Sequence, residues 1–177
     1  MTKTISIDIG NLRNAVTLSP AMVTAYAEAA RVMLDNYHQS RERLEGLLVH
    51  DDDERPLVLL FDPPDEQMHA SYANTQDATE YGAYAVAFGA AHKTEGYVVK
   101  KRAYHGSGAD FLMVKDGESS ENFVRLEVSG IGSPQGNLQT RLERKKSQLN
   151  SGDLLRPGVA VVVGFGAVRI LMEDCPL

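Results

Sequence analysis

The sequence predicts one α/β domain of the α+β type, in which a mixed central sheet is flanked by helices. Two observations carry this prediction. Short β-branched or wholly apolar segments recur along the chain, and longer segments with helical periodicity or capping residues lie between them. A chain of 177 residues with 43% hydrophobic residues can build one sizeable core.

The N-terminal part is expected to follow the order strand, helix, strand. The segment KTISIDI at 3–9 alternates in polarity and predicts a strand, with a second short strand at 15–18. The Ser-Pro pair at 19–20 is a typical helix start, and apolar residues follow it at helical spacing to about residue 38. The apolar segment PLVLLF at 56–61 predicts a buried strand.

The acidic run HDDDE at 50–54 has the side chains of a metal site. It lacks the glycine and the ligand spacing of a calcium loop. A solvated turn is therefore the expected structure of this run.

A second helix is expected from about Asn74 to His92. Asn74 can cap it, with Asp77 three residues later, and EYGAYAVAFGAA is rich in small residues that allow close approach to a sheet. Glu80 is notable, because a carboxylate on such an apolar helix is costly unless it is paired, hydrogen-bonded or bound to a cation. The alternative is that Glu80 points to solvent near the helix start, where the helix dipole favours it.

The chain is organised around two strands joined by a polar loop, expected at 109–115 and 123–129 after a strand at 96–104. Asp110 opens the first of these two strands and Glu127 lies late in the second. Carboxylates on adjacent strands can gather oxygen ligands for a divalent metal.

Both carboxylates also have structural interpretations. Asp110 follows a glycine-rich turn and can cap it. Glu127 can pair across the sheet with Arg125 or Arg102. Alternation along the strand places Arg125, Glu127 and Ser129 on the same face.

A third, basic helix is expected at 137–150, followed by strands at 159–163 and 167–172. Local basic surfaces can steer a polyanion, although solvated faces are the alternative. The residues expected to contact nucleic acid or another anion are Lys100, Lys101, Arg141, Arg144 and Gln148.

From residue 74 onward, the order helix, strand, strand, strand, helix, strand resembles the restriction-endonuclease-like PD-(D/E)XK nuclease superfamily. The resemblance implies an αβββαβ core at 71–172, preceded by the strand-helix-strand extension at 1–70, within a single domain at 1–177. In that superfamily a helix acid, an Asp and a Glu-x-Lys triplet bind Mg²⁺ or Mn²⁺. The metal ligands that it implies here are Glu80, Asp110 and Glu127.

The chain departs from the superfamily pattern at one position, because Ser129 stands where the Lys is expected. A hydroxyl cannot supply the positive charge that assists attack on a phosphodiester. Lys145 on the following helix is the expected substitute, with Lys100 or Lys101 in reserve. The catalytic set implied by the resemblance is Glu80, Asp110, Glu127, Ser129 and Lys145.

The blocks RLEVSG and RLERKKSQ also resemble those of a group of uncharacterised bacterial proteins of similar length. That second resemblance implies no particular function.

The composition excludes several classes of protein. A net charge of −6 argues against a protein that coats nucleic acid non-specifically. The single cysteine, Cys175, allows neither an internal disulfide nor a Cys-type metal site. No long apolar run and no signal-peptide core are present in the sequence, so a cytoplasmic protein without membrane contact is expected.

Three functions remain open at this stage. The first is a Mg²⁺- or Mn²⁺-dependent phosphodiesterase acting on DNA or RNA, for example in bacterial defence. The second is a nuclease fold without catalysis that serves as a binding or scaffold subunit, with a protein partner or as a homodimer. The third is a nucleotide or anion binder that uses Arg141, Arg144 and Lys145 on one helix.

Overall fold

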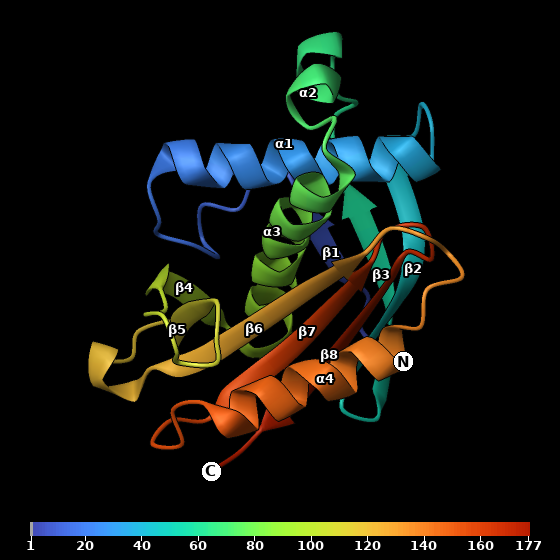
Figure 1. The fold of residues 1–177 in the computed structure, drawn as a ribbon. Helices are drawn as coiled ribbons and strands as arrows, with labels where there is room; N and C mark the ends of the chain where they lie inside the picture. Colours follow the sequence, from blue (N-terminus) through green and yellow to red (C-terminus); the bar gives the residue numbers. More distant parts are fainter. Residues whose placement is uncertain (1) are drawn as a thin grey trace.

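The computed structural model describes residues 2–177 and has the α+β architecture expected from the sequence (Figure 1). The helices are α1 (Pro20–Tyr37), α2 (Glu66–Ser71), α3 (Thr75–Glu95) and α4 (Leu138–Ser151). The strands are β1 (Ile5–Asp8), β2 (Arg43–His50), β3 (Asp53–Leu60), β4 (Tyr97–Arg102), β5 (Phe111–Lys115), β6 (Val124–Ile131), β7 (Gly158–Gly164) and β8 (Arg169–Cys175).

One mixed sheet contains all eight of these strands, in the order β1-β3-β2-β8-β7-β6-β5-β4. β4, β5 and β6 form an antiparallel meander, and β6 pairs with β7 in parallel through the α4 crossover. The N-terminal strands join the same sheet, because β2 pairs in parallel with β8. The N-terminal extension and the C-terminal part therefore share one continuous sheet.

Helices cover both faces of the sheet, with α3 and α1 on one face and α4 on the other (Figure 1). Alternate residues of β7 show the division, because Val161 belongs to the large core under α3 while Val162 packs under α4. No helix within residues 2–177 is long and apolar enough to cross a membrane.

The helix boundaries follow the capping residues. Ser19 accepts a hydrogen bond from the amide of Met22 at the start of α1, and Asn74 accepts from Gln76 and Asp77 at the start of α3. Helix α3 ends at Gly96, which adopts the left-handed conformation with φ 72°.

Three parts of the N-terminal region differ from the prediction. Strand β2, which is absent from the predicted strand-helix-strand order, makes a hairpin with β3, and the short helix α2 follows. The predicted strand at 15–18 is reduced to a single parallel bridge between Val16 and Val99. The acidic run does contain a turn at 51–52, but His50 at its start is buried.

Close packing of α1 on α3 depends on Gly82. A Cβ atom at Gly82 would lie 2.9 Å from Cα of Ala30, a backbone atom that cannot move independently of α1. We expect Gly82→Val to lower the free energy of unfolding by about 2–3 kcal/mol, because the helices must separate. Urea denaturation measures this loss. Gly10→Val is the matched control, since its Cβ meets only a side-chain oxygen at 3.4 Å, and equal midpoints for the two variants would contradict the argument.

Candidate functional site

The candidate site lies where β5 separates from β6. The two strands pair only from Phe111 to Met113 on β5, so the end of β6 continues without β5 beside it. The start of α3 and the middle of α4 enclose this opening and leave a hollow of about 520 Å³. Its lining consists of Thr75, Gln76, Thr79, Glu80, Tyr84, Asp110, Val128, Ser129, Gly130, Arg141 and Lys145.

Asp110 is held at the point of separation by backbone groups of β6. Its amide donates to the carbonyl of Leu126 at 2.9 Å, and its Oδ2 accepts from the amide of Val128 at 2.9 Å. The Asp110 carboxylate thus accepts a hydrogen bond from β6 that a backbone carbonyl preceding β5 would otherwise accept. This hydrogen bond fixes the orientation of Asp110 and leaves Oδ1 directed toward Tyr84, whose hydroxyl is 3.3 Å away.

Tyr84 connects Asp110 to Glu80. Its buried hydroxyl donates to Glu80 Oε1 at 2.7 Å, one helical turn earlier on α3. Burial, together with the charge of Asp110, raises the pKa of Tyr84, so the hydroxyl stays protonated and remains a donor. The exposed carboxylate of Glu80 is thereby drawn toward the hollow.

Glu127 and Lys145 form the most buried charged contact of the site. Lys145 Nζ donates to Glu127 Oε1 at 2.6 Å, and the side chain of Glu127 is only 1% exposed. Burial and the nearby charge of Asp110 raise the pKa of Glu127 to about 7, against the opposing effect of Lys145. The second oxygen, Oε2, is buried and accepts a hydrogen bond from no donor within residues 2–177, while the Asp110 carboxylate lies within hydrogen-bonding reach of a protonated Glu127.

The other side chains of α4 complete one wall. Arg141 donates to Ser129 Oγ at 2.8 Å, and Lys145 also donates to Gln148 Oε1 at 3.3 Å. Arg141 and Lys145 are thus directed at residues of β6, whereas Gln148 contacts Lys145 and does not line this hollow. Lys145 thus lies beside Glu127, where the resemblance to the PD-(D/E)XK superfamily implies a positive charge.

Three of the basic residues expected to bind nucleic acid lie outside this hollow. Arg144 and Lys100 are exposed and do not line it. Lys101 lies over the ring of Phe123, with Nζ 4.8 Å from the ring centroid. The reserve role for Lys100 or Lys101 is therefore unsupported by their positions, and Lys145 is the lysine that pairs with Glu127 within residues 2–177.

Sequence reasoning missed Tyr84. The signal was present, because residues i and i+4 of a helix share a face and Tyr84 follows Glu80 by four positions. The alternative interpretation, in which Glu127 pairs with Arg125 or Arg102, differs from the structure, where Glu127 pairs with Lys145. Arg125 instead donates to backbone carbonyl oxygens.

Two carboxylates of the site are of the kind that could hold a divalent cation. Mg²⁺ commonly uses one or two protein carboxylates together with water and substrate oxygens. Asp110 and Glu127 are adjacent, and Oε2 of Glu127 accepts a hydrogen bond from no donor within residues 2–177. Glu80 is joined to the pair through the Tyr84 hydroxyl.

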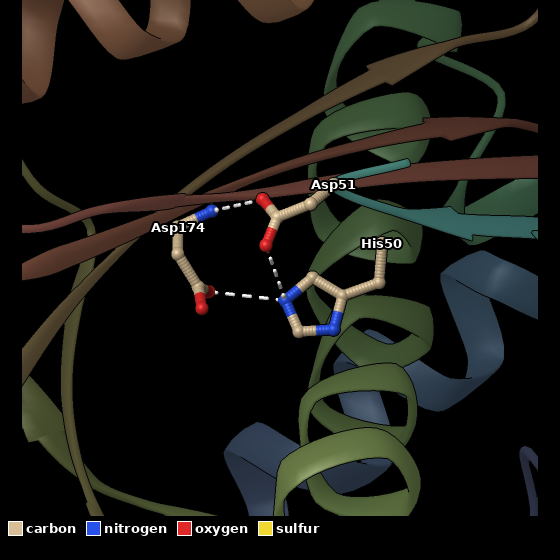
Figure 2. A group of neighbouring side chains, drawn as sticks. All are labelled: His50, Asp51 and Asp174. Carbon is tan, nitrogen blue, oxygen red and sulfur yellow. Dashed lines mark hydrogen bonds and ion pairs between the residues drawn. The ribbon is translucent and has the colours of Figure 1, made fainter. Parts of the chain in front are cut away.

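A different group has the tightest arrangement of potential metal ligands within residues 2–177. The ligand atoms of His50, Asp51 and Asp174 all lie within 4.8 Å of one another (Figure 2). His50 Nε2 is 3.0 Å from Asp174 Oδ1, and its Nδ1 is 3.5 Å from Glu95 Oε1. Both imidazole nitrogens already face carboxylates, and the group ties the β2–β3 turn to β8.

Searches with this chain against protein-family models, curated proteins and solved structures found no match.

Proposed function

We propose that this protein is a divalent-metal-dependent phosphodiesterase of the restriction-endonuclease-like type that acts on DNA or RNA. The observation that carries the proposal is the buried Oε2 atom of Glu127, which accepts a hydrogen bond from no donor within residues 2–177, in a carboxyl group that lies next to Asp110 and whose Oε1 is held by Lys145. The order α3-β4-β5-β6-α4-β7, with parallel β6 and β7, supports the same class.

The proposed roles follow from the contacts. Asp110 and Glu127 would hold Mg²⁺ or Mn²⁺, and Glu80 would orient Asp110 through Tyr84. The cation would supply charge stabilisation to a phosphodiester and lower the pKa of a bound water. Lys145 and Arg141 line the same hollow and are positioned to bind the phosphate oxygens that enter it.

A nuclease fold that serves as a binding subunit is the second candidate, and one observation favours it. The oxygen atoms of Glu80, Asp110 and Glu127 do not form a group within 4.8 Å in residues 2–177. The Tyr84 hydroxyl stands between two of these carboxylates and Lys145 is paired with the third. A site that binds no metal also needs its carboxylates to be paired with other side chains in this way.

Calorimetric titration with Mn²⁺ distinguishes these functions. We expect wild-type protein to bind Mn²⁺ and Asp110→Asn to weaken this binding by roughly 100-fold, because a ligand carboxylate is replaced by a neutral amide. Asp174→Asn is the matched control at the other acidic cluster and should bind as the wild type does. Loss of binding only in Asp174→Asn would move the metal to His50, and no binding to the wild type would favour the binding subunit.

A further inference from the structure

A second hollow adjoins the proposed metal site. It also measures about 520 Å³ and shares Asp110 with the first, while Gln148 of α4 lines its opposite side. The amide of Ala103 donates to the carbonyl of Asp110 at 3.0 Å, so Tyr104 lies one residue beyond the pair. The loop after β4 therefore connects the site of the carboxylates to this second hollow.

The wall of the second hollow is built from rigid parts. Buried Arg125 donates to the carbonyls of Ser107 and Leu149, which ties the loop to the end of α4. Gly152 packs so closely on this loop that a Cβ atom there would lie 2.1 Å from the Ser107 carbonyl oxygen. Gly108 adopts φ 73°, a conformation that favours glycine. Such a wall is arranged before a ligand binds.

The side chains of this hollow combine an aromatic ring with a cation. Tyr104 is 62% exposed, and its hydroxyl donates to Asp153 Oδ2 at 3.5 Å, which leaves the ring accessible to a ligand. The Arg102 guanidinium lies 4.6 Å from the ring centroid of Phe111 and 5.4 Å from that of Tyr84, which fixes its place. Aromatic rings that stack on bases beside cations that contact phosphates are typical of single-strand binding sites.

We propose that the second hollow is a base-binding subsite and that the substrate is single-stranded nucleic acid. The base next to the scissile phosphate stacks on Tyr104, and Arg102 contacts the flanking phosphate. An unpaired base is required, because a ring stacked within a duplex does not expose its face. The net charge of −6 agrees with a short contact of this kind, since a long duplex would be repelled. This inference rests on the proposed phosphodiesterase function.

Fluorescence polarisation with 5′-labelled (dT)₁₀ in the presence of Ca²⁺ tests the subsite. We expect (dT)₁₀ to bind at least tenfold more tightly than the corresponding (dA)₁₀·(dT)₁₀ duplex. Tyr104→Ala should weaken binding of (dT)₁₀ about tenfold or more, whereas Tyr104→Phe keeps the ring and should stay within about twofold. Tyr37→Ala is the matched control, because Tyr37 is 39% exposed and lines neither hollow.

The outcomes separate this inference from the proposed function. Equal affinity for the duplex, or unchanged binding in Tyr104→Ala, overturns the base-binding subsite even where Mn²⁺ binds and DNA is cleaved. A Tyr104-dependent preference for (dT)₁₀ in a protein that neither binds Mn²⁺ nor cleaves DNA supports the subsite and overturns the phosphodiesterase.

Discussion

Glu127→Gln is expected to abolish Mn²⁺ binding and, at pH 8, to make the metal-free protein more stable than the wild type by about 1–3 kcal/mol. At this pH the wild-type fold holds a buried carboxylate beside Asp110, with one oxygen lacking any hydrogen-bond partner. The amide of Gln can still accept from Lys145 through its oxygen. Its NH₂ group can donate a hydrogen bond to Asp110, and this bond replaces the repulsion between the two carboxylates.

The pH dependence of this effect has a defined sign. The pKa of Glu127 rises from 4.5 to about 7 on folding, chiefly because of burial. The folded state therefore binds more protons than the unfolded state between these values, and wild-type stability from this group falls as pH rises through the interval. The difference between Glu127→Gln and wild type should be small below pH 4.5 and complete above pH 7.

Urea denaturation in EDTA at several pH values measures the difference. Glu173→Gln is the matched control, because Glu173 also pairs with a lysine of α4, Lys146, but is 30% exposed. Loss of that pair should lower stability slightly at pH 8. A Glu127→Gln variant less stable than the wild type at pH 8 would show that the carboxylate is a structural partner of Lys145 rather than a site kept for a cation.

Local signals account for the part of the fold that the sequence predicts well. The Asn74 cap lies close to the start of α3, and the polar segment after Asn137 coincides with α4. The alternation of polar and apolar residues also predicts β6, with Glu127 and Ser129 on the same face of the strand. Glu80 and Lys145 could therefore be placed on α3 and α4. Asp110, which the sequence predicted to open the strand at 109–115, instead lies in the loop one residue before β5.

The remainder depends on contacts between distant segments. Strand β2 has no strict alternation in RLEGLLVH, and it forms a strand because it lies between β3 and β8. The burial of His50 follows from the same pairing. Lys145 could be proposed as the substitute cation of the site. Its direct pairing with Glu127 and the environment of Oε2 could not be predicted, because both depend on how α4 packs across the parallel pair of β6 and β7.

Arg125→Ala is expected to lower the free energy of unfolding by about 3–5 kcal/mol. The guanidinium is 3% exposed and donates to the carbonyl oxygens of Leu149 at 2.7 Å, Arg156 at 3.1 Å and Ser107 at 3.3 Å. Alanine removes all three of these hydrogen bonds, leaving the carbonyl oxygens of Leu149 and Ser107 only the amides of Gly152 and Asp153, and it also removes a large buried side chain. The end of α4 and the wall of the second hollow would both lose their connection to β6.

Urea denaturation of Arg125→Ala and Arg156→Ala tests this role. Arg156 is a half-buried arginine of the same region with weaker contacts, to Asp153 at 3.8 Å and to the carbonyl of Glu121 at 3.4 Å, so its loss should change stability by less than about 1 kcal/mol. Similar losses in the two variants would contradict the assignment. A large loss confined to Arg125→Ala means that the rigidity of the second hollow originates in β6, the strand that also carries Glu127. The same strand would then fix both the proposed metal ligand and the surface on which a base is expected to stack.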